Sequence, residues 1–299
     1  MPRLTVITSV YHTRHDYLDI AIKSILDQTY SDFDYLITID DPNSTDDLEY
    51  IRSTYKDPRI TVMINERNLG PGESLNKLAR LATTEFVAVM DSDDYSYPTR
   101  LEKEMAYLDS HDVGLVSTDL DCIDENGELL YCYNSPVTDK RLYEDFEVAH
   151  APMIFRKELF DKINGYRDIK MHDCDFLVRA RLAGYSFGII PEPLYSYRLL
   201  ETSFLHTSYF LQQNQRICVL NAYKEGRVAS LEEIDEYVKE HAVDKKTEQD
   251  YAKAAHYYRK STAESYHGET VQRYWDFLLC LCSSKLRRKK FFDRLLKRS

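Results

Sequence analysis

The chain has 299 residues, of which 43% are hydrophobic and 30% charged. These proportions are ordinary for a globular protein and exclude a disordered or collagen-like chain. At a prior of roughly 150 residues per domain, the length predicts one large domain or two modest ones. The 39 Lys and Arg against 50 Asp and Glu give a net charge of −11. Such an acidic chain argues against a nucleic-acid partner, which requires a basic surface.

Two further features bear on where the protein works. The longest apolar run, 277–282, has six residues, far fewer than the ~18–20 that span a bilayer. The N-terminus runs straight into a strand-like segment without the apolar region of a signal peptide. Six cysteines occur without a CxxC pair, which disfavours a zinc site and, without a signal peptide, favours reduced thiols in the cytoplasm.

The first 120 residues alternate between two hydrophobic periods. Short runs rich in Val, Ile and Leu predict buried strands at 4–10, 35–39, 60–64, 86–90 and 114–118. Apolar positions at helical spacing predict helices between them, the first capped by Asp16. The second follows a break at residues 70–72, and Pro98 opens the third at its first position. The alternation predicts an α/β fold with a mostly parallel sheet covered by helices on both faces.

The character of the sequence changes after residue 204. Helical patterns continue, with loop breaks between them, at 205–224, 231–241, 248–263 and 269–283. Ser230 and Glu233 have the spacing of a capping box at one helix start. We therefore expect two regions, a sheet-containing region over 1–204 and a C-terminal helical region over 205–299.

Three carboxylates, Asp91, Asp93 and Asp94, directly follow the predicted strand 86–90. Ligands of open α/β sheets bind beyond the carboxyl ends of the strands. Neighbouring like charges are unfavourable unless a cation neutralises them. Hard oxygen ligands suit Mg²⁺ or Mn²⁺, which would clamp a diphosphate. A solvated acidic turn that caps the next helix is an equally good interpretation.

Two further acidic sites have a functional and a structural interpretation each. Asp40 and Asp41 close the strand 35–39, where a carboxylate would accept a hydrogen bond from the N–H of a base. Turn chemistry alone favours a simple Asx-rich turn there. Asp173 lies before a predicted helix, 176–184, that ends at Gly184. It would act as a general base or as a helix cap whose carboxylate complements the helix dipole.

Taken in order, these segments resemble the inverting glycosyltransferases of family 2, which have the GT-A nucleotide-sugar fold. The resemblance extends over about residues 3–200. The motifs that carry it are TVITSVYH at 5–12, AIKSILDQTY at 21–30, IDDPNSTD at 39–46, NLG at 68–70 with Asn76, DSDD at 91–94, HAPMIFR at 150–156 with GY at 165–166, and HDCDFLVR at 172–179.

The resemblance implies a role for each matching residue. Tyr11 and Asp41, with Asp40 nearby, would hold uracil or an equivalent base. Asp91 would approach the ribose, and Asp93 would bind Mn²⁺ or Mg²⁺ on the diphosphate. Asp173 would take the proton from the acceptor hydroxyl, which attacks the anomeric carbon opposite the departing nucleoside diphosphate and inverts that centre. The other residues expected to contact the nucleotide sugar are Ser9, Arg67, Asn76 and Ser92.

The sequence also departs from the family pattern. His172 replaces the usual Glu before the base, and we favour a packing role for it over a phosphate contact. Pro42 and Asn43 stand where the base-binding turn usually has Gly. The Q-x-x-R-W motif of processive members is missing, since the single Trp is Trp275 in another context. We therefore expect a non-processive enzyme. The resemblance to family 2 implies that its donor is a UDP-sugar and that it acts in cell-surface polysaccharide synthesis.

The last fifteen residues, 285–299, hold eight Lys or Arg and one Asp. On a helix their Phe and Leu residues share one face, so the segment suits an anionic membrane surface. Peripheral binding at the inner face of the membrane would fit a lipid-linked acceptor, as an alternative to a soluble glycan. A solvated helix, or one docked on the acidic domain, is equally compatible with the pattern.

Two rival functions differ in class from the transferase. A GT-A domain that has lost catalysis and only binds would show a broken DxD or no base, and both are present here. A phosphatase that used Asp91 as nucleophile and Asp93 as acid would need the DxD after its first strand, whereas here it follows the fourth. Neither a Walker loop nor a GxGxxG occurs, which excludes the common ATP and NAD motifs.

Overall fold

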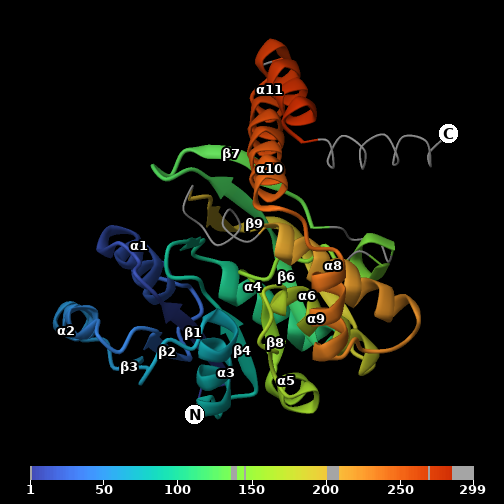
Figure 1. Cartoon of the computed structure of the whole chain (residues 1–299). Coiled ribbons are helices and arrows are strands. Elements are labelled where there is room, and N and C mark those ends of the chain that lie inside the picture. The colour runs from blue at the N-terminus through green and yellow to red at the C-terminus, as the bar shows by residue number, and fades with distance from the viewer. Residues whose placement is uncertain (1, 136–139, 145, 201–208, 269, 285–299) are drawn as a thin grey trace.

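The computed structural model describes residues 2–135, 140–144, 146–200, 209–268 and 270–284 (Figure 1). Within these residues the strands form one sheet in the order β3-β2-β1-β4-β8-β6-β9-β5, with β7 paired to β6. The strands are β1 (Leu4–Val10), β2 (Phe33–Ile39), β3 (Ile60–Ile64), β4 (Phe86–Val89), β5 (Tyr95–Ser96), β6 (Leu115–Ile123), β7 (Leu129–Tyr133), β8 (Ile154–Arg156) and β9 (Phe187–Arg198).

The sheet has a parallel half and a mixed half. The pairs β3/β2, β2/β1 and β1/β4 are parallel, as the strand and helix alternation predicts. Beyond β4 the short strand β8 is antiparallel to both β4 and β6, while β6 and β9 are parallel. Antiparallel neighbours need no helical crossover. The α/β prediction is therefore confirmed, and the sheet is mixed as a whole.

Helices of the first 200 residues cover both faces of this sheet. They are α1 (His15–Leu26), α2 (Thr45–Thr54), α3 (Pro71–Leu81), α4 (Arg100–Ser110), α5 (Lys157–Ile163) and α6 (His172–Leu182), and residues 140–144 form one π-helical turn. Alternate residues of β1 point to opposite faces. Val6 packs in one core cluster with Ile22 of α1, and Ile7 packs in the other with Leu78 of α3.

Two predicted helix starts are corrected. Asp16 lies in the first turn of α1, whose N-cap is Arg14, so Asp16 complements the helix dipole instead of capping the helix. Helix α4 begins at Arg100, not at Pro98. Pro98 follows the first residue of a turn in which the Arg100 amide donates to the Tyr97 carbonyl at 3.0 Å. The fixed φ of proline suits that second turn position.

The C-terminal helices are α8 (Tyr209–Lys224), α9 (Leu231–Glu240), α10 (Lys245–Tyr266) and α11 (Thr270–Ser283). The predicted capping box is present, because Ser230 and Glu233 each accept from the other's backbone amide. Val219 of α8 and Ile234 of α9 belong to the same core cluster as Phe176 of α6. In contrast, α10 and α11 lie side by side and rise away from the sheet (Figure 1).

Two sequence-based expectations are left open by this fold. Division into regions at residue 204 stays a prediction, and the basic segment 285–299 lies outside the described residues. Among the helices that are described, none combines the length and the apolar character needed to cross a membrane.

Candidate active site

The carboxyl ends of the parallel strands bring the first predicted residues to one edge of the sheet. Ser9 of β1 is in register with Thr38 of β2, and the Asp40 amide donates to the Val10 carbonyl at 2.8 Å. Because β4 is parallel to β1, the acidic run that follows β4 comes out at the same edge. The predicted convergence at the strand ends is therefore present.

Asp40 is buried and holds the loop after β3 in place. Its Oδ1 accepts from Asn65 Nδ2 and from the Leu69 amide, and its Oδ2 accepts from the Gly70 amide, each at 2.8 Å. Gly70 has a φ of +78°, which glycine adopts without strain, and α3 begins at the next residue. Asp40 thus positions the start of α3, and its carboxylate is committed to these contacts.

Asp41 lies beside the aromatic pair that follows β1. The Asn43 amide donates to Asp41 Oδ1 at 2.9 Å, and this hydrogen bond is the main reason that the Asp41 pKa is lowered. His12 Nε2 lies 3.6 Å from Asp41 Oδ2, and the His12 ring centroid is 4.2 Å from that of Tyr11. Tyr11 is 53% exposed. The predicted Asx turn is therefore present, and it also places the ionised Asp41 carboxylate near the exposed ring of Tyr11.

The DSDD run is crowded with negative charge. Burial, followed by the neighbouring Asp93 carboxylate, raises the pKa of Asp91 to about 7. Burial raises the pKa of Asp93, and burial together with Asp93 and Asp91 raises that of Asp94 well above its usual value. Asp94 Oδ1 accepts from the Arg198 amide at 2.7 Å, and Ser92 Oγ lies 2.6 Å from Thr13 Oγ1. Ser92 thus ties this turn to the loop after β1.

The donor set of this run fits a hard divalent cation. Its carboxylate oxygens are the ligands that Mg²⁺ and Mn²⁺ prefer. A cation would offset the burial and the mutual repulsion that together raise the pKa values of Asp91 and Asp94. In the described part of the chain, groups of three or more His, Cys, Asp or Glu side chains that would hold a metal are not found.

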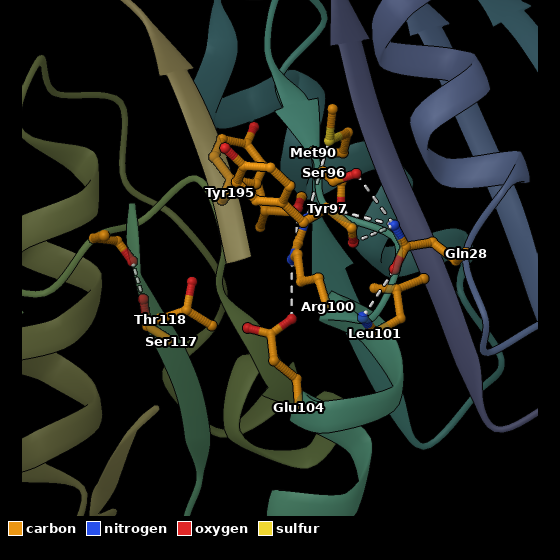
Figure 2. A network of polar contacts seen from close by, with 12 residues as sticks. Gln28, Met90, Ser96, Tyr97, Arg100, Leu101, Glu104, Ser117, Thr118 and Tyr195 are labelled. Atoms are coloured by element: carbon orange, nitrogen blue, oxygen red, sulfur yellow. Dashed lines mark hydrogen bonds and ion pairs between the residues drawn. The ribbon is translucent and has the colours of Figure 1, made fainter. Parts of the chain in front are cut away.

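A buried polar network holds the C-terminal end of β4 in place (Figure 2). Arg100 Nη2 donates to the Val89 carbonyl at 2.8 Å, and Arg100 Nε donates to Glu104 Oε2 at 2.9 Å. The Arg100 guanidinium also lies over the Tyr195 ring, and the Tyr195 hydroxyl accepts from the Asp91 amide at 3.1 Å. These contacts hold the backbone of Asp91 without using its carboxylate. Sequence reasoning missed them.

Asp173 lies in the first turn of α6, across from the acidic run. The N-cap of α6 is Met171, so Asp173 does not cap the helix, and its Oδ1 accepts from the Cys174 amide at 2.7 Å. Its carboxylate is one of the groups that raise the pKa of Asp91, although burial and Asp93 contribute more. The two carboxylates, 82 positions apart in the sequence, therefore face the same region.

An aromatic and histidine cluster surrounds Asp173. His150 Nε2 lies 2.9 Å from the Tyr166 hydroxyl, and the His172 ring centroid lies 5.8 Å from that of His150. Burial, followed by His172, lowers the pKa of His150 to about 4, while Asp173 opposes this shift. His172 also packs on Gly72 of α3, as the packing interpretation expects. His150 and Tyr166 were missed as site residues, although both lie in motif segments.

The last two predicted residues occupy different environments. Asn76 is buried, and its side chain donates to the Tyr166 carbonyl at 2.8 Å and accepts from the Tyr166 amide at 2.7 Å. It thus positions Tyr166. Arg67 is exposed and lines a cleft of about 460 Å³ together with Lys77, whose ammonium donates to Asn65 Oδ1 at 2.7 Å. This cleft is formed in part by the loop after β3, which the hydrogen bonds to Asp40 hold in place.

Solved structures share this architecture. TarS of S. aureus, crystallised with UDP-GlcNAc, superposes with a TM-score of 0.61 at 15% identity, over 92% of this chain and 89% of that chain. The mannosyltransferase PcManGT of Pyrobaculum calidifontis, in complex with GDP-Man and Mn²⁺, superposes with a TM-score of 0.58 at 16% identity, over 96% and 86%. At these identities the likeness supports the fold alone, and it confirms the GT-A architecture.

Sequence relatives identify the family. An uncharacterised glycosyltransferase of Methanocaldococcus jannaschii is 34% identical over 206 residues, which is 66% of this chain and 71% of the relative. The O-antigen biosynthesis glycosyltransferase WbnJ of Escherichia coli is 33% identical over 169 residues, 54% and 65% of the two chains. Residues 5–164 match the family described as glycosyl transferase family 2. The chain therefore belongs to glycosyltransferase family 2, with relatives in polysaccharide biosynthesis.

Proposed function

We propose that this enzyme moves a sugar from a nucleoside-diphosphate sugar, with UDP-sugars favoured, to a hydroxyl of a glycan or lipid-linked acceptor. The transfer inverts the anomeric centre, is non-processive and contributes to cell-surface polysaccharide. The observation that carries this proposal is the convergence of the loop after β1, the Asp40–Asp41 turn and the acidic run 91–94 at the carboxyl edge of the parallel strands, with Asp173 near enough to contribute to the raised pKa of Asp91. On this proposal the acidic run serves the donor and Asp173 serves the acceptor.

The donor's base would lie against Tyr11, with Asp41 accepting a hydrogen bond from its N–H. Asp91 would approach the ribose, and Ser9 and Arg67 would line the nucleotide. Three further residues support the proposal indirectly, because Asp40, Ser92 and Asn76 hold the segments that carry these groups. The complexes of TarS with UDP-GlcNAc and of PcManGT with GDP-Man support a nucleotide-sugar donor of this kind.

Asp93 would hold a Mn²⁺ or Mg²⁺ ion together with the donor's diphosphate. When bound, the cation would neutralise the charge that develops on the leaving diphosphate. PcManGT contains Mn²⁺ in its complex, which supports the choice of metal. Burial raises the pKa of Asp93, and a backbone hydrogen bond and, to a smaller extent, the Arg198 guanidinium oppose this rise.

Asp173 would remove the proton from the acceptor hydroxyl as that oxygen bonds to the anomeric carbon. The bond between this carbon and the diphosphate oxygen breaks on the opposite face, and the nucleoside diphosphate leaves with the electron pair. Because the attacking and leaving oxygens lie on opposite sides, the configuration inverts. Holding both substrates in this line supplies much of the rate.

The remaining expectations concern organisation and place. We retain the division into a donor-binding and catalytic region, 1–204, and a helical region, 205–299. The basic segment 285–299 would bind an anionic membrane at the cytoplasmic face, where a lipid-linked acceptor is presented.

Thermal-shift measurements with UDP, GDP, CDP and dTDP, each with and without Mn²⁺, test this proposal. A ligand that binds only the native state raises its stability by RT ln(1 + [L]/Kd). We expect one nucleotide to raise the Tm only when Mn²⁺ is present. Asp93→Ala should abolish this metal-dependent shift, whereas Asp235→Ala, an exposed change on α9, should retain it.

Comparing the two variants distinguishes the loss of a specific metal ligand from the general effect of removing one negative charge. A folded wild type that responds to none of the nucleotides contradicts the proposed donor site. A shift that survives Asp93→Ala removes Asp93 from its assigned role. In either case the rival interpretation as a domain without catalysis would regain support.

A further inference from the structure

A second cavity lies between β7 and the two projecting helices, away from the residues discussed so far. Its volume is about 500 Å³. Its lining residues come from β7, from the C-terminal half of α10 and from α11, the two helices that rise beside the sheet in Figure 1. His267, which follows α10, lies with its Nε2 2.9 Å from the Leu129 carbonyl of β7. Helix and hairpin are therefore in direct contact beside the cavity.

The lining of this cavity combines aromatic rings with hydroxyl groups. Its aromatic residues are Tyr131, Tyr258, Tyr266, Tyr274 and Phe277. One stretch of α10 adds the hydroxyls of Ser261, Thr262 and Ser265. Among the described residues, none of the lining side chains is charged. Tyrosine offers an apolar ring face and a polar tip, and hydroxyl groups both donate and accept hydrogen bonds.

This chemistry matches a neutral carbohydrate. A pyranose ring presents C–H groups on its faces and hydroxyls around its edge, so it packs on aromatic rings and forms hydrogen bonds at the same time. An anionic ligand would lack a cation among the described lining residues. Each hydroxyl group can both donate and accept hydrogen bonds, so the lining favours a ligand rich in hydroxyls over a purely lipid one. Pockets that are largely apolar with a few placed polar groups are typical of specific small-ligand sites.

Hydrogen bonds connect the cavity to the segment that follows the acidic run. The Tyr266 hydroxyl lies 3.3 Å from Cys132 Sγ, and Cys132 Sγ lies 2.9 Å from Asp121 Oδ1. The Tyr97 hydroxyl donates to Asp121 Oδ2 at 2.7 Å, and Tyr97 lies three positions after Asp94. From Cys132 in the cavity wall, two side-chain contacts therefore lead to Tyr97, in the segment that follows the acidic run.

We propose that the cavity between β7, α10 and α11 binds a neutral carbohydrate portion of the acceptor. This inference rests on the proposed function, because it supplies the acceptor for the transfer assigned above. The aromatic site would select acceptors by the part of the glycan that does not react.

The test uses the full chain and defined oligosaccharides. Saturation-transfer NMR would measure binding of cellotetraose, chitotetraose and mannotetraose, with tetragalacturonate as the anionic comparison. Tyr258→Ala and Tyr266→Ala remove lining rings. Trp275→Ala is the matched control, because Trp275 lies on α11 at 57% exposure, close to the 48% of Tyr258, yet does not line the cavity. Phosphatidylglycerol vesicles test lipid binding by the same proteins.

We expect at least one neutral oligosaccharide to bind the wild type and Trp275→Ala, and to bind the two tyrosine variants at least about tenfold more weakly, which is about 1.4 kcal/mol. The nucleotide-dependent Tm shift should persist in all variants, and this would show that the fold and donor site are intact. Tyr266→Phe should keep most of the binding, because it retains the ring.

Several results would overturn the proposal. They are binding of no neutral oligosaccharide to the wild type, equal binding by the tyrosine variants, preference for tetragalacturonate, or loss of vesicle binding alone in those variants. The nucleotide-dependent Tm shift tests the proposed function separately. If the wild type lacks a nucleotide shift, the transferase mechanism fails, and the oligosaccharide measurements still decide whether this cavity binds carbohydrate.

Discussion

The two halves of the sheet hold their functional side chains in different ways. In the parallel half, Asp40 and Asp41 accept from backbone amides, those of Leu69 and Gly70 in one case and of Asn43 in the other. In the mixed half, His150 and Asp175 are held by side chains that come from other segments. The carboxylates of the donor side are thus held largely by backbone amides, whereas His150 and Asp175 on the acceptor side are held by other side chains.

This difference predicts that point mutations act differently on the two sides. A backbone amide remains when a neighbouring side chain is replaced, so the donor edge should keep its shape. A contact between two side chains is lost when either is changed, and the partner is then left buried and unpaired. Mutations on the acceptor side should therefore have the larger effects on catalysis and stability.

The largest effect is expected from Asp173→Asn. The amide keeps the size of the side chain but accepts a proton poorly, and loss of a general base lowers kcat by about 10²–10⁴-fold. Release of nucleoside diphosphate, with the donor selected by the thermal-shift panel, measures this loss. Asp168→Asn, at an exposed position on the preceding segment, is the control and should have near wild-type activity. Activity of Asp173→Asn within threefold or so of wild type would exclude Asp173 as the base.

The next effect concerns the buried ion cluster that fixes the segment before α6. Asp175 is buried and accepts from both Arg167 and Arg179, while Arg179 also donates to the Gly165 carbonyl at 2.6 Å. Asp175→Asn leaves two arginines without their counter-charge, and breaking a buried pair costs about 3–5 kcal/mol. Urea unfolding measures the loss in the free energy of unfolding.

Asp235→Asn, an exposed change on α9, serves as the control for that measurement. A surface substitution of this kind should alter the free energy of unfolding by no more than about 0.5 kcal/mol. Equal stability of the two variants would show that the acceptor side does not depend on this cluster.

His150 gives the acceptor side a pH dependence. Burial and the neighbouring His172 lower its pKa from 6.5 to about 4. A group with a depressed pKa in the folded state stabilises the fold above its unfolded pKa, and this contribution is lost as the pH falls. Stability should therefore decline between pH 6.5 and 4, by about 1–3 kcal/mol from this group.

Urea unfolding across that pH range would detect the decline, and His150→Gln should flatten it. His256→Gln, which changes an exposed histidine of α10, should leave the wild-type slope in place. If the slope of His150→Gln equals that of the wild type, another group is responsible for the acid sensitivity.

The difference between the two halves of the sheet also explains how much of the fold could be predicted from the sequence. The strands that lead to Asp40 and Asp91 are apolar runs bounded by polar turns, so period and position suffice to find them. The three-residue strand β8 is too short to show a period, yet it inserts between β4 and β6 and makes the sheet mixed. Parallel order was therefore predictable only where helices alternate with long strands.

Prediction of the site from the sequence is limited in the same way. The base motif and the DxD could be located by family resemblance, but the contacts between Asn76 and Tyr166 join positions 90 residues apart. Nothing near either residue in the sequence indicates its partner. Arg100 was likewise hidden, because an arginine at a helix start usually suggests a solvated charge, and here it is fully buried under Tyr195.

The smallest effect is expected on the donor side, at Tyr11. Its ring is half exposed at the strand edge and would stack on the base of the nucleotide. Removing one aromatic partner of a base costs about 1–3 kcal/mol of binding, so Tyr11→Ala should weaken nucleotide affinity about 5- to 150-fold. Tyr11→Phe keeps the ring and should bind nearly as well as the wild type. Calorimetric titration with the nucleotide and Mn²⁺ compares the three proteins.

The free energy of unfolding should not change in Tyr11→Ala, because an exposed ring contributes little to the core. Equal affinity for the wild type and Tyr11→Ala would remove Tyr11 from the base site, while equal weakening by Ala and Phe would assign the role to the hydroxyl and not to the ring.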